Sequence, residues 1–232
     1  MNGYHRNGWV DITEIARGER FDPFYHQMYF DLIEKSIEKT SYSKTKLGNQ
    51  ISAITYGASV NNNYVENGIP LLRIKDLKRN EINVEEVVYL PESEKNLLGN
   101  CFVKENEFLI SRSGTIGIVA IVSKDIDGFA FGSFMIKFSL KQNVEIVHEF
   151  LSYYLNSSLM IKLIERNKIG AIQGNITIPT IKNFPLILPN IEKQQEIATH
   201  ISTLRQQAQM LQKDAIQTLQ QAKEKIEKMI LE

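Results

Sequence analysis

The C-terminal stretch Asn190–Glu232 reads NIEKQQEIATHISTLRQQAQMLQKDAIQTLQQAKEKIEKMILE and contains neither glycine nor proline. Gln, Lys, Glu, Ala and Leu dominate it, and these residues are strong helix formers. Asn190 is placed to cap the first turn, and Glu192 lies within that turn, near the positive end of the helix dipole. The stretch therefore predicts one continuous helix over 190–232, which at 1.5 Å per residue would be roughly 60 Å long.

Apolar and small residues recur along this predicted helix at intervals of four and three. The spacing is typical of a coiled-coil seam with one interruption, between Leu211 and Leu219, where two intervals of four follow each other. We expect a partner helix to cover the seam, because the helix is too long and too polar to pack wholly on its own domain. A helix lying along its own domain is the alternative. The seam residues are Ile197, Ile201, Leu204, Ala208, Leu211, Ala215, Leu219, Ala222, Ile226 and Met229.

The chain before this helix shows short apolar runs bounded by Gly, Asn, Pro and Ser, a pattern typical of strands. Helical periodicity interrupts them twice, over 24–39 and, as one or two helices, over 144–165. We predict an α+β fold: a mixed domain over 1–189, with a helical N-terminal segment 1–46, followed by the helix 190–232. The strand-like runs are 51–57, 69–77, 84–90, 108–111, 116–123, 129–140 and 184–189.

Several classes of site find no support in the composition. The single cysteine, Cys101, excludes an internal disulfide and a cysteine-based zinc site, and the four histidines lack metal-ligand spacing, so no metal is expected. No apolar stretch approaches the length of about 18 residues that a membrane span needs, and the N-terminus does not resemble a signal peptide. We expect a cytoplasmic protein without a membrane partner.

The charge balance argues mildly against a nucleic-acid-binding protein. The chain has 27 basic and 27 acidic residues, whereas nucleic-acid-binding domains usually carry a basic excess. The charges are locally segregated, however. Residues 71–80 contain four cations against one acid, and an acidic stretch follows. Solvated surface faces often show the same segregation.

The polar segment SRSGT, Ser111–Thr115, separates two apolar runs and is predicted to be a turn between two strands. No G-x-S-x-G or Walker pattern is present, and DPFY (22–25) lacks the glycine-rich loop that a methyltransferase needs, so we assign no catalytic residue. Arg112 between two apolar strands would be energetically unfavourable unless its charged guanidinium binds a partner. Arginine can contact guanine with two hydrogen bonds or clamp a phosphate.

Two further polar loops resemble this one. Residues 56–63, YGASVNNN, precede a predicted strand on which Arg73 and Lys75 would share a face. Residues 173–175, QGN, contain the two amide side chains that commonly contact adenine, although an ordinary polar loop is the better explanation of this segment taken in isolation. Three such loops with cations nearby, and no acid–base or metal set, indicate a binding surface rather than an active site.

Taken in order, several segments resemble the DNA-sequence specificity (S) subunit of type I restriction–modification systems. Each fragment is short, but their order and spacing cover most of the chain. The matching segments are RFDPFYH (20–26), KLGNQISAITYG (46–57), GIPLLRIKDL (68–77), ENEFLISRSGTIGIVAIV (105–122) and GAIQGNITIPTIKNFPLILPNIEKQQEIATHI (170–201).

The resemblance implies a non-catalytic subunit in which a target recognition domain reads one half of a split double-stranded DNA target and a long helix acts as spacer. It also implies docking of methyltransferase and restriction subunits. No cofactor is expected in this chain, because S-adenosylmethionine would belong to the methyltransferase subunit. A complete S subunit resembles two such domain–helix units. This sequence shows one, without an internal repeat, and so resembles a half subunit.

From this resemblance we predict DNA contacts at Arg73, Lys75, Ser111, Arg112, Ser113, Gly114, Gln173 and Asn175. The helix would pair with a second copy or with another half subunit, or the chain would be a cassette joined to another by recombination. The alternative is a coiled-coil assembly adaptor whose α+β head binds protein, which the zero net charge favours. A hydrolase or a methyltransferase has less support, because no catalytic set can be assembled.

Overall fold

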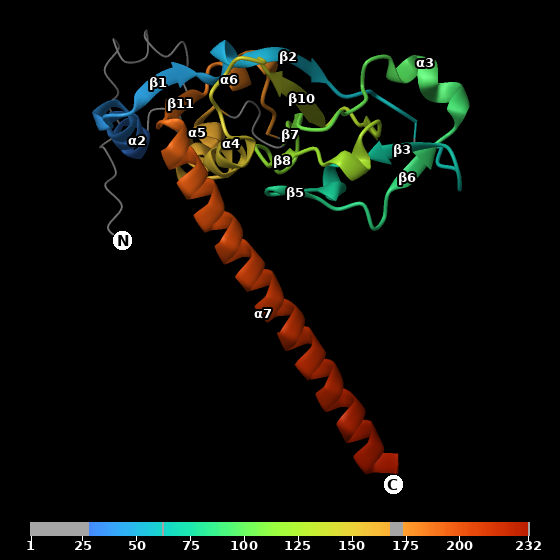
Figure 1. The fold of residues 1–232 in the computed structure, drawn as a ribbon. Coiled ribbons are helices and arrows are strands. Elements are labelled where there is room, and N and C mark those ends of the chain that lie inside the picture. The colour runs from blue at the N-terminus through green and yellow to red at the C-terminus, as the bar shows by residue number, and fades with distance from the viewer. Residues whose placement is uncertain (1–27, 62, 168–173, 232) are drawn as a thin grey trace.

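The computed structural model describes residues 28–61, 63–167 and 174–231 and shows a mixed head from which one long helix projects (Figure 1). The predicted α+β architecture is confirmed. The helices are α2 (Met28–Lys39), α3 (Lys95–Leu98), α4 (His148–Leu155), α5 (Ser158–Arg166), α6 (Ile178–Lys182) and α7 (Ile191–Leu231). The strands are β1 (Ser43–Lys46), β2 (Ile51–Tyr56), β3 (Ile69–Leu72), β4 (Leu77–Lys78), β5 (Glu81–Ile82), β6 (Val88–Leu90), β7 (Phe108–Ser111), β8 (Val119–Ile121), β9 (Ala130–Phe131), β10 (Met135–Leu140) and β11 (Pro185–Leu188).

The central sheet of the head has the strand order β2-β10-β7-β8, and every neighbouring pair in it is antiparallel. A second sheet, β6-β3-β9, pairs β3 with β9 in parallel. Two ribbons complete the head, β4-β5 and β1-β11. The β1-β11 ribbon joins the first strand to the last, with Ser43 opposite Leu188, so the chain returns to the start of the head just before α7 begins.

Two predicted strand runs are broken in the structure. The run 129–140 forms β9 and β10, separated by a turn at Gly132–Phe134 that the hydrogen bond from the Met135 backbone N–H to the carbonyl oxygen of Gly132 closes. The run 69–77 ends as a strand at Leu72, because the Asp76 carboxylate accepts a hydrogen bond from the Arg73 backbone N–H and caps a short 3-10 helix, Ile74–Asp76.

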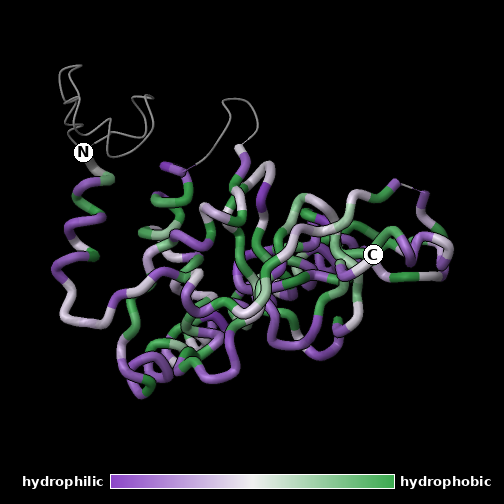
Figure 2. Tube along the Cα trace, turned by 90° about the horizontal axis from the view of Figure 1, so that it is seen from above, coloured by the Kyte–Doolittle hydropathy of each residue, from purple (hydrophilic) through white to green (hydrophobic). Residues whose placement is uncertain are grey.

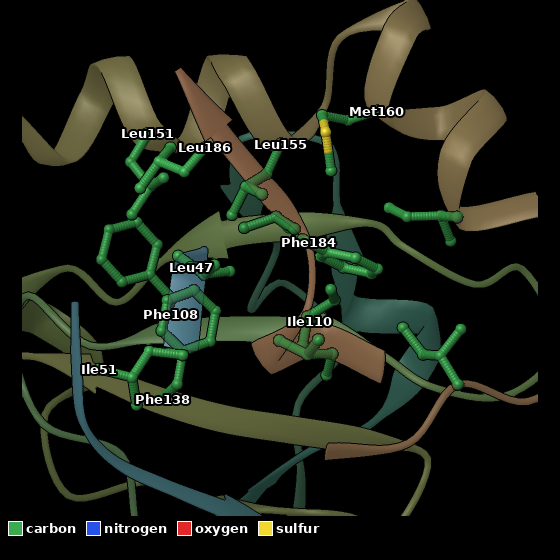
Figure 3. Packing of buried hydrophobic residues seen from close by; sticks show 14 of the residues in the cluster. Leu47, Ile51, Phe108, Ile110, Phe138, Leu151, Leu155, Met160, Phe184 and Leu186 are labelled. Atoms are coloured by element: carbon green, nitrogen blue, oxygen red, sulfur yellow. The ribbon is translucent and has the colours of Figure 1, made fainter. Parts of the chain in front are cut away.

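The main hydrophobic core lies between the central sheet and helices α4, α5 and α6 (Figure 3). Phe108 and Phe138, neighbours on β7 and β10, stack with their ring centroids 4.8 Å apart, and both are fully buried. Leu109 points to the other side of the sheet and joins a second core beneath β3 and β9. Because β7 is buried on both faces, its first three residues, Phe108–Ile110, are a continuous apolar run rather than an alternating one.

The helical region 144–165 divides into α4 and α5 at Asn156–Ser157. The Asn156 side chain donates to the carbonyl oxygen of Ser152 and binds both backbone groups of Val119, which ties the end of α4 to β8. The Ser157 side chain then caps α5 by accepting from the Met160 backbone N–H. Helix α2 packs beside α5 through a salt bridge from Arg166 to Glu34, and hydrophilic and hydrophobic residues alternate along its trace (Figure 2).

Helix α7 is continuous over its whole length, as predicted, and Asn190 caps it by accepting from the Lys193 backbone N–H at 3.1 Å. Its first turns pack against α4, where Gln194 and Ala198 are buried. Beyond Arg205 every residue up to Leu231 is exposed, and the helix leaves the head as a rod (Figure 1). No helix within the described residues is long and apolar enough to span a membrane.

The predicted seam lies beside the face of α7 that contacts the head. Each of three seam residues precedes a head-facing residue by one position, as Ile197 precedes Ala198, which is about 100° of rotation around the helix. Ile197 and Ile201 are therefore half-buried, whereas the later seam residues Leu204, Ala208, Leu211, Ala215, Leu219, Ala222, Ile226 and Met229 are exposed. The described part of this chain leaves most of the seam uncovered.

Candidate nucleic-acid interface

Three loops leave the same end of the central sheet. Strand pairing places Tyr56, the last residue of β2, opposite Ile136 on β10, and Ser111, the last residue of β7, opposite Met135. The loops that follow β2 and β7 and the turn that precedes β10 therefore start side by side. Two of the three polar loops predicted to bind a ligand, 56–63 and 111–115, are brought together in this way.

Arg112 lies at the centre of this end of the sheet. Its backbone N–H donates to the carbonyl oxygen of Phe134 at 2.9 Å, and its own carbonyl oxygen accepts from Ile176 at 3.0 Å. Its guanidinium carbon sits 4.6 Å from the centre of the Tyr56 ring, a cation–π contact that restrains the position of the charged group. The Nε atom is buried without a hydrogen-bond partner among the described residues.

The arrangement around Arg112 leaves it available to a ligand. Among the described residues no carboxylate pairs with its guanidinium, and none accepts a hydrogen bond from its terminal nitrogens. A guanidinium placed over an aromatic ring, with no carboxylate partner among the described residues, suits an acceptor such as a base edge or a phosphate.

The residues next to Arg112 also have structural roles. Ser111 has no exposed surface, and its hydroxyl oxygen accepts from the Ile118 backbone N–H at 2.8 Å, so it closes the loop. Ser113 is also buried and forms a β-bridge with Asn175. DNA contacts at Ser111 and Ser113 stay predictions. Gly114 is exposed at the loop tip with φ +75°, a conformation that favours glycine.

The third predicted loop joins the first through this bridge. Asn175 pairs with Ser113 across the bridge and is half-buried, and the neighbouring Ile176 donates to the Arg112 carbonyl oxygen. Segments more than sixty residues apart in the sequence therefore meet at Arg112. Gln173, predicted beside them, lies outside the described residues.

Arg73 and Lys75 do not share the face of a strand, as the sequence suggested, because the strand ends at Leu72. Both cations have acidic or carbonyl partners: Arg73 binds Asp76 and the carbonyl oxygen of Glu86, and Lys75 forms a salt bridge with the Glu86 side chain. The hydrogen bond from Lys75 holds the pKa of Glu86 below its usual value. These partners compete with any anionic ligand for the two cations.

The turn Gly132–Phe134 links the two cationic positions. Gly132 donates to the carbonyl oxygen of Leu72, immediately before Arg73, and Phe134 accepts from Arg112. The side chain of Phe134 is 49% exposed, which is unusual for a phenylalanine in a structured turn. We name Tyr56, Arg112 and Phe134 the Arg112 platform.

Sequence reasoning missed two of the three platform residues. It placed Tyr56 both in the strand run 51–57 and in the polar loop 56–63, but not among the DNA contacts. In the structure Tyr56 ends β2, and its hydroxyl accepts from the Ile178 backbone N–H. It gave Phe134 to the interior of a strand, although the preceding Gly132-Ser133 pair is a turn signal that places the phenylalanine outside both strands. Within the described residues, no cluster of His, Cys, Asp or Glu could hold a metal ion.

A family model described as "Type I restriction modification DNA specificity domain" matches residues 31–221, which is most of the chain and includes the platform and much of α7. The chain belongs to this family. The predicted resemblance is thereby confirmed.

Curated relatives agree with the specificity-domain family. The chain is 25% identical over 194 residues to the type I restriction enzyme EcoBI specificity subunit of Escherichia coli, which covers 79% of this chain and 40% of that protein. It is 28% identical over 176 residues to the MjaVIII specificity subunit of Methanocaldococcus jannaschii, covering 72% of this chain and 40% of that protein. The chain thus spans about 40% of the length of these relatives.

Solved structures of specificity subunits share the fold. The S subunit from M. genitalium aligns with a TM-score of 0.51 at 16% identity, over 72% of this chain and 40% of that one. The HsdS subunit from Thermoanaerobacter tengcongensis aligns with a TM-score of 0.52 at 16% identity, over 84% of this chain and 47% of that one. A chain from a study of complex assembly in the type I R-M system aligns with a TM-score of 0.56 at 17% identity, over 89% of this chain and 52% of that one.

Proposed function

We propose that this specificity domain reads one half of a bipartite double-stranded DNA target, with the Arg112 platform in contact with base edges. The support is the guanidinium of Arg112, stacked on Tyr56 and without a carboxylate partner among the described residues. Arginine donating to O6 and N7 of guanine is the commonest specific protein–DNA contact, and it requires a fixed guanidinium plane. The net charge of zero is compatible with this function, because a contact to a base depends on the local positive charge of Arg112 and not on the net charge of the whole chain.

Helix α7 serves in this proposal as the spacer and as the pairing element. Leu211 and Leu219 are 70% and 65% exposed on the part of the helix beyond Arg205, where every described residue is exposed. Burying one leucine side chain fully contributes about 1.5–3 kcal/mol, so a seam of eight exposed positions favours association with another helix. A second copy, related by a two-fold axis, would place two heads on two half-sites of a split palindrome.

The chain itself supplies recognition and no catalysis in this proposal. Methyltransferase and restriction subunits would dock on it, and S-adenosylmethionine would be bound by the methyltransferase subunit. The named relatives are specificity subunits, which supports this division of labour.

The decisive experiment is a comparison of Arg112→Ala with the unchanged protein. A preferred DNA site is first selected from a random library with the methyltransferase subunit present, and affinities for that site and for scrambled DNA are then measured over a range of salt concentrations. If Arg112 reads a base, affinity for the selected site falls by about 1–3 kcal/mol, roughly 5- to 150-fold, while affinity for scrambled DNA changes much less.

Two other outcomes would change the proposal. Equal weakening on both DNAs, with the salt slope reduced by about one, would assign Arg112 to a phosphate. Unchanged affinity on both would remove it from the interface, and the failure of the protein to select any DNA site would favour an assembly adaptor. Lys213→Ala, which removes one charge from the exposed part of α7, is the matched control and is expected to leave the specificity ratio unchanged.

A further inference from the structure

Gln194 is a buried polar residue at the base of α7. It is 1% exposed, although it lies on a helix that is largely solvated. Its amide nitrogen donates to the carbonyl oxygen of Pro189 at 2.9 Å and to that of Glu145 at 3.1 Å, and its amide oxygen accepts from the Val147 backbone N–H at 3.0 Å. Both amide hydrogens and the oxygen are therefore used, which leaves the side chain one orientation.

These hydrogen bonds join three separate parts of the chain. Glu145 and Val147 lie directly before α4, Pro189 ends the link from β11, and Gln194 itself is in the second turn of α7. The carbonyl oxygens of Glu145 and Pro189 and the N–H of Val147 all converge on one planar amide group. Because an amide is rigid, the position of α7 is fixed relative to the start of α4.

A second contact, two turns further along, gives the helix a direction. Tyr153 on α4 shares a hydrogen bond of 2.8 Å with Ser202 on α7, eight residues or roughly 12 Å from Gln194 along the axis. The Arg205–Glu81 pair beyond it has a separation of 3.9 Å between half-exposed and exposed side chains and adds little. The link Leu188–Pro189–Asn190 contains no glycine, and proline restricts its own φ, so the link offers little freedom of its own.

The length of α7 amplifies any change at this base. From Gln194 to Leu231 the helix extends about 55 Å, so a tilt of roughly 10° at Gln194 moves its tip by about 10 Å. That displacement corresponds to about three base pairs at roughly 3.4 Å each. A helix that sets the distance between two DNA half-sites would need its base to be rigid.

We infer that Gln194 is a positioning residue that fixes the direction of α7 relative to the head and so sets the separation of the half-sites. The first part stands on the hydrogen bonds alone, and the second rests on the proposed DNA function. The role inferred for Gln194 differs from that of the Arg112 platform, because Gln194 would act through the helix and not by contacting a base.

The direction of α7 is measured by the distance between two spin labels, one at Lys124 on the head and one at Lys213 on the rod, both exposed. The labels are attached to cysteines in a Cys101→Ser background, and labelled chains are diluted with unlabelled ones so that only distances within one chain contribute. The unchanged protein is expected to give one narrow distance distribution. Gln194→Leu, which removes all three side-chain hydrogen bonds at similar volume, is expected to broaden or shift it by several ångströms.

Two variants keep the test decisive. Gln194→Glu retains the shape and the acceptor for Val147 but, when ionised, donates to neither carbonyl oxygen, so it is expected to broaden the distribution even if Gln194→Leu fails to fold. Gln217→Leu makes the same substitution on the exposed rod and should leave the distances unchanged. A narrow, unshifted distribution in a folded Gln194 variant would overturn the inference.

The DNA consequence is measured separately on the selected site, with the spacer between half-sites varied by one base pair at a time. The unchanged protein is expected to prefer one spacer length by at least about 10-fold, and Gln194→Glu is expected to reduce that preference by about 3- to 10-fold while each half-site is still bound. If the distances broaden but spacer preference does not change, the ruler role is wrong. Because the label distances need no DNA, failure of the proposed DNA function would leave them as they are.

Discussion

The head and the rod of this molecule use apolar residues in opposite ways. In the head, Phe108 is fully buried and stacks on Phe138. On the rod, Leu219 is 65% exposed and has no comparable packing within the described chain. The head therefore buries most of its hydrophobic residues internally, whereas the described part of the chain leaves those of the rod exposed. The head is thus stabilised by contacts within the chain, whereas the proposed pairing of the rod would add stability only through association.

The largest expected difference between the two regions is in the free energy of unfolding. Phe108→Ala should destabilise the head by about 3–5 kcal/mol, because it leaves a cavity in the main core. Leu219→Ala should change head unfolding by less than about 0.5 kcal/mol, because the side chain is exposed. Urea denaturation followed by circular dichroism, at concentrations low enough to keep the chain monomeric, measures both. Similar losses of unfolding free energy in the two variants would contradict the contrast between a buried core in the head and exposed apolar residues on the rod.

Self-association, in contrast to unfolding, should be sensitive to substitutions in the rod. Leu219→Lys places a charge in the seam and is expected to weaken self-association by about 100-fold or more, equivalent to about 2.7 kcal/mol, because the charge would have to be desolvated. Gln217→Lys introduces the same charge two residues away, about 200° around the helix, and should have little effect. Sedimentation equilibrium at micromolar concentrations measures the change. A protein that stays monomeric without any substitution would contradict pairing with a second copy.

Exposed apolar residues on the head should matter for DNA rather than for stability. Phe134→Ser is expected to weaken binding to the selected DNA site by about 10-fold, at the lower end of what one base contact contributes, with an unchanged melting temperature. Leu97→Ser, at a residue that is 68% exposed on α3, is the matched control and should change neither quantity. Equal effects of the two substitutions on DNA affinity would exclude a specific role for Phe134.

The smallest expected effect is a pH dependence confined to the head. Burial lowers the pKa of His148, which stacks on Phe108, and the nearby Glu149 only partly opposes this shift. Between the lowered pKa and the ordinary value of about 6.5, the unfolded chain binds a proton that the folded chain does not. His148 therefore contributes stability above about pH 6.5 that is lost as the pH falls.

Thermal melting at pH 7.5 and pH 5.5 tests this sign. The melting temperature of the unchanged protein should be lower at pH 5.5 than at pH 7.5. His148→Gln, which cannot titrate, should show a smaller decrease. An identical fall in both proteins would show that other groups carry the dependence.

The sequence alone determined the rod and the class of the head. Helix propensity and apolar spacing are local properties, so Asn190 as the cap, the continuous helix and the seam were all predictable. The hairpin of β7 and β8 was predictable for the same reason, since a polar turn separates two apolar runs. Family membership followed from the order of short segments rather than from any single one of them.

Only the tertiary structure decided which residues meet. The burial of Ser111, the end of β3 at Leu72 and the stack of Arg112 on Tyr56 depend on contacts between segments far apart in the sequence, which no local pattern encodes. The same holds for Gln194, which reads as one polar helix residue among many until the carbonyl oxygens of Glu145 and Pro189 converge on it. Local propensity fixes which elements form, whereas burial and hydrogen bonding between distant segments fix what their side chains are available to do.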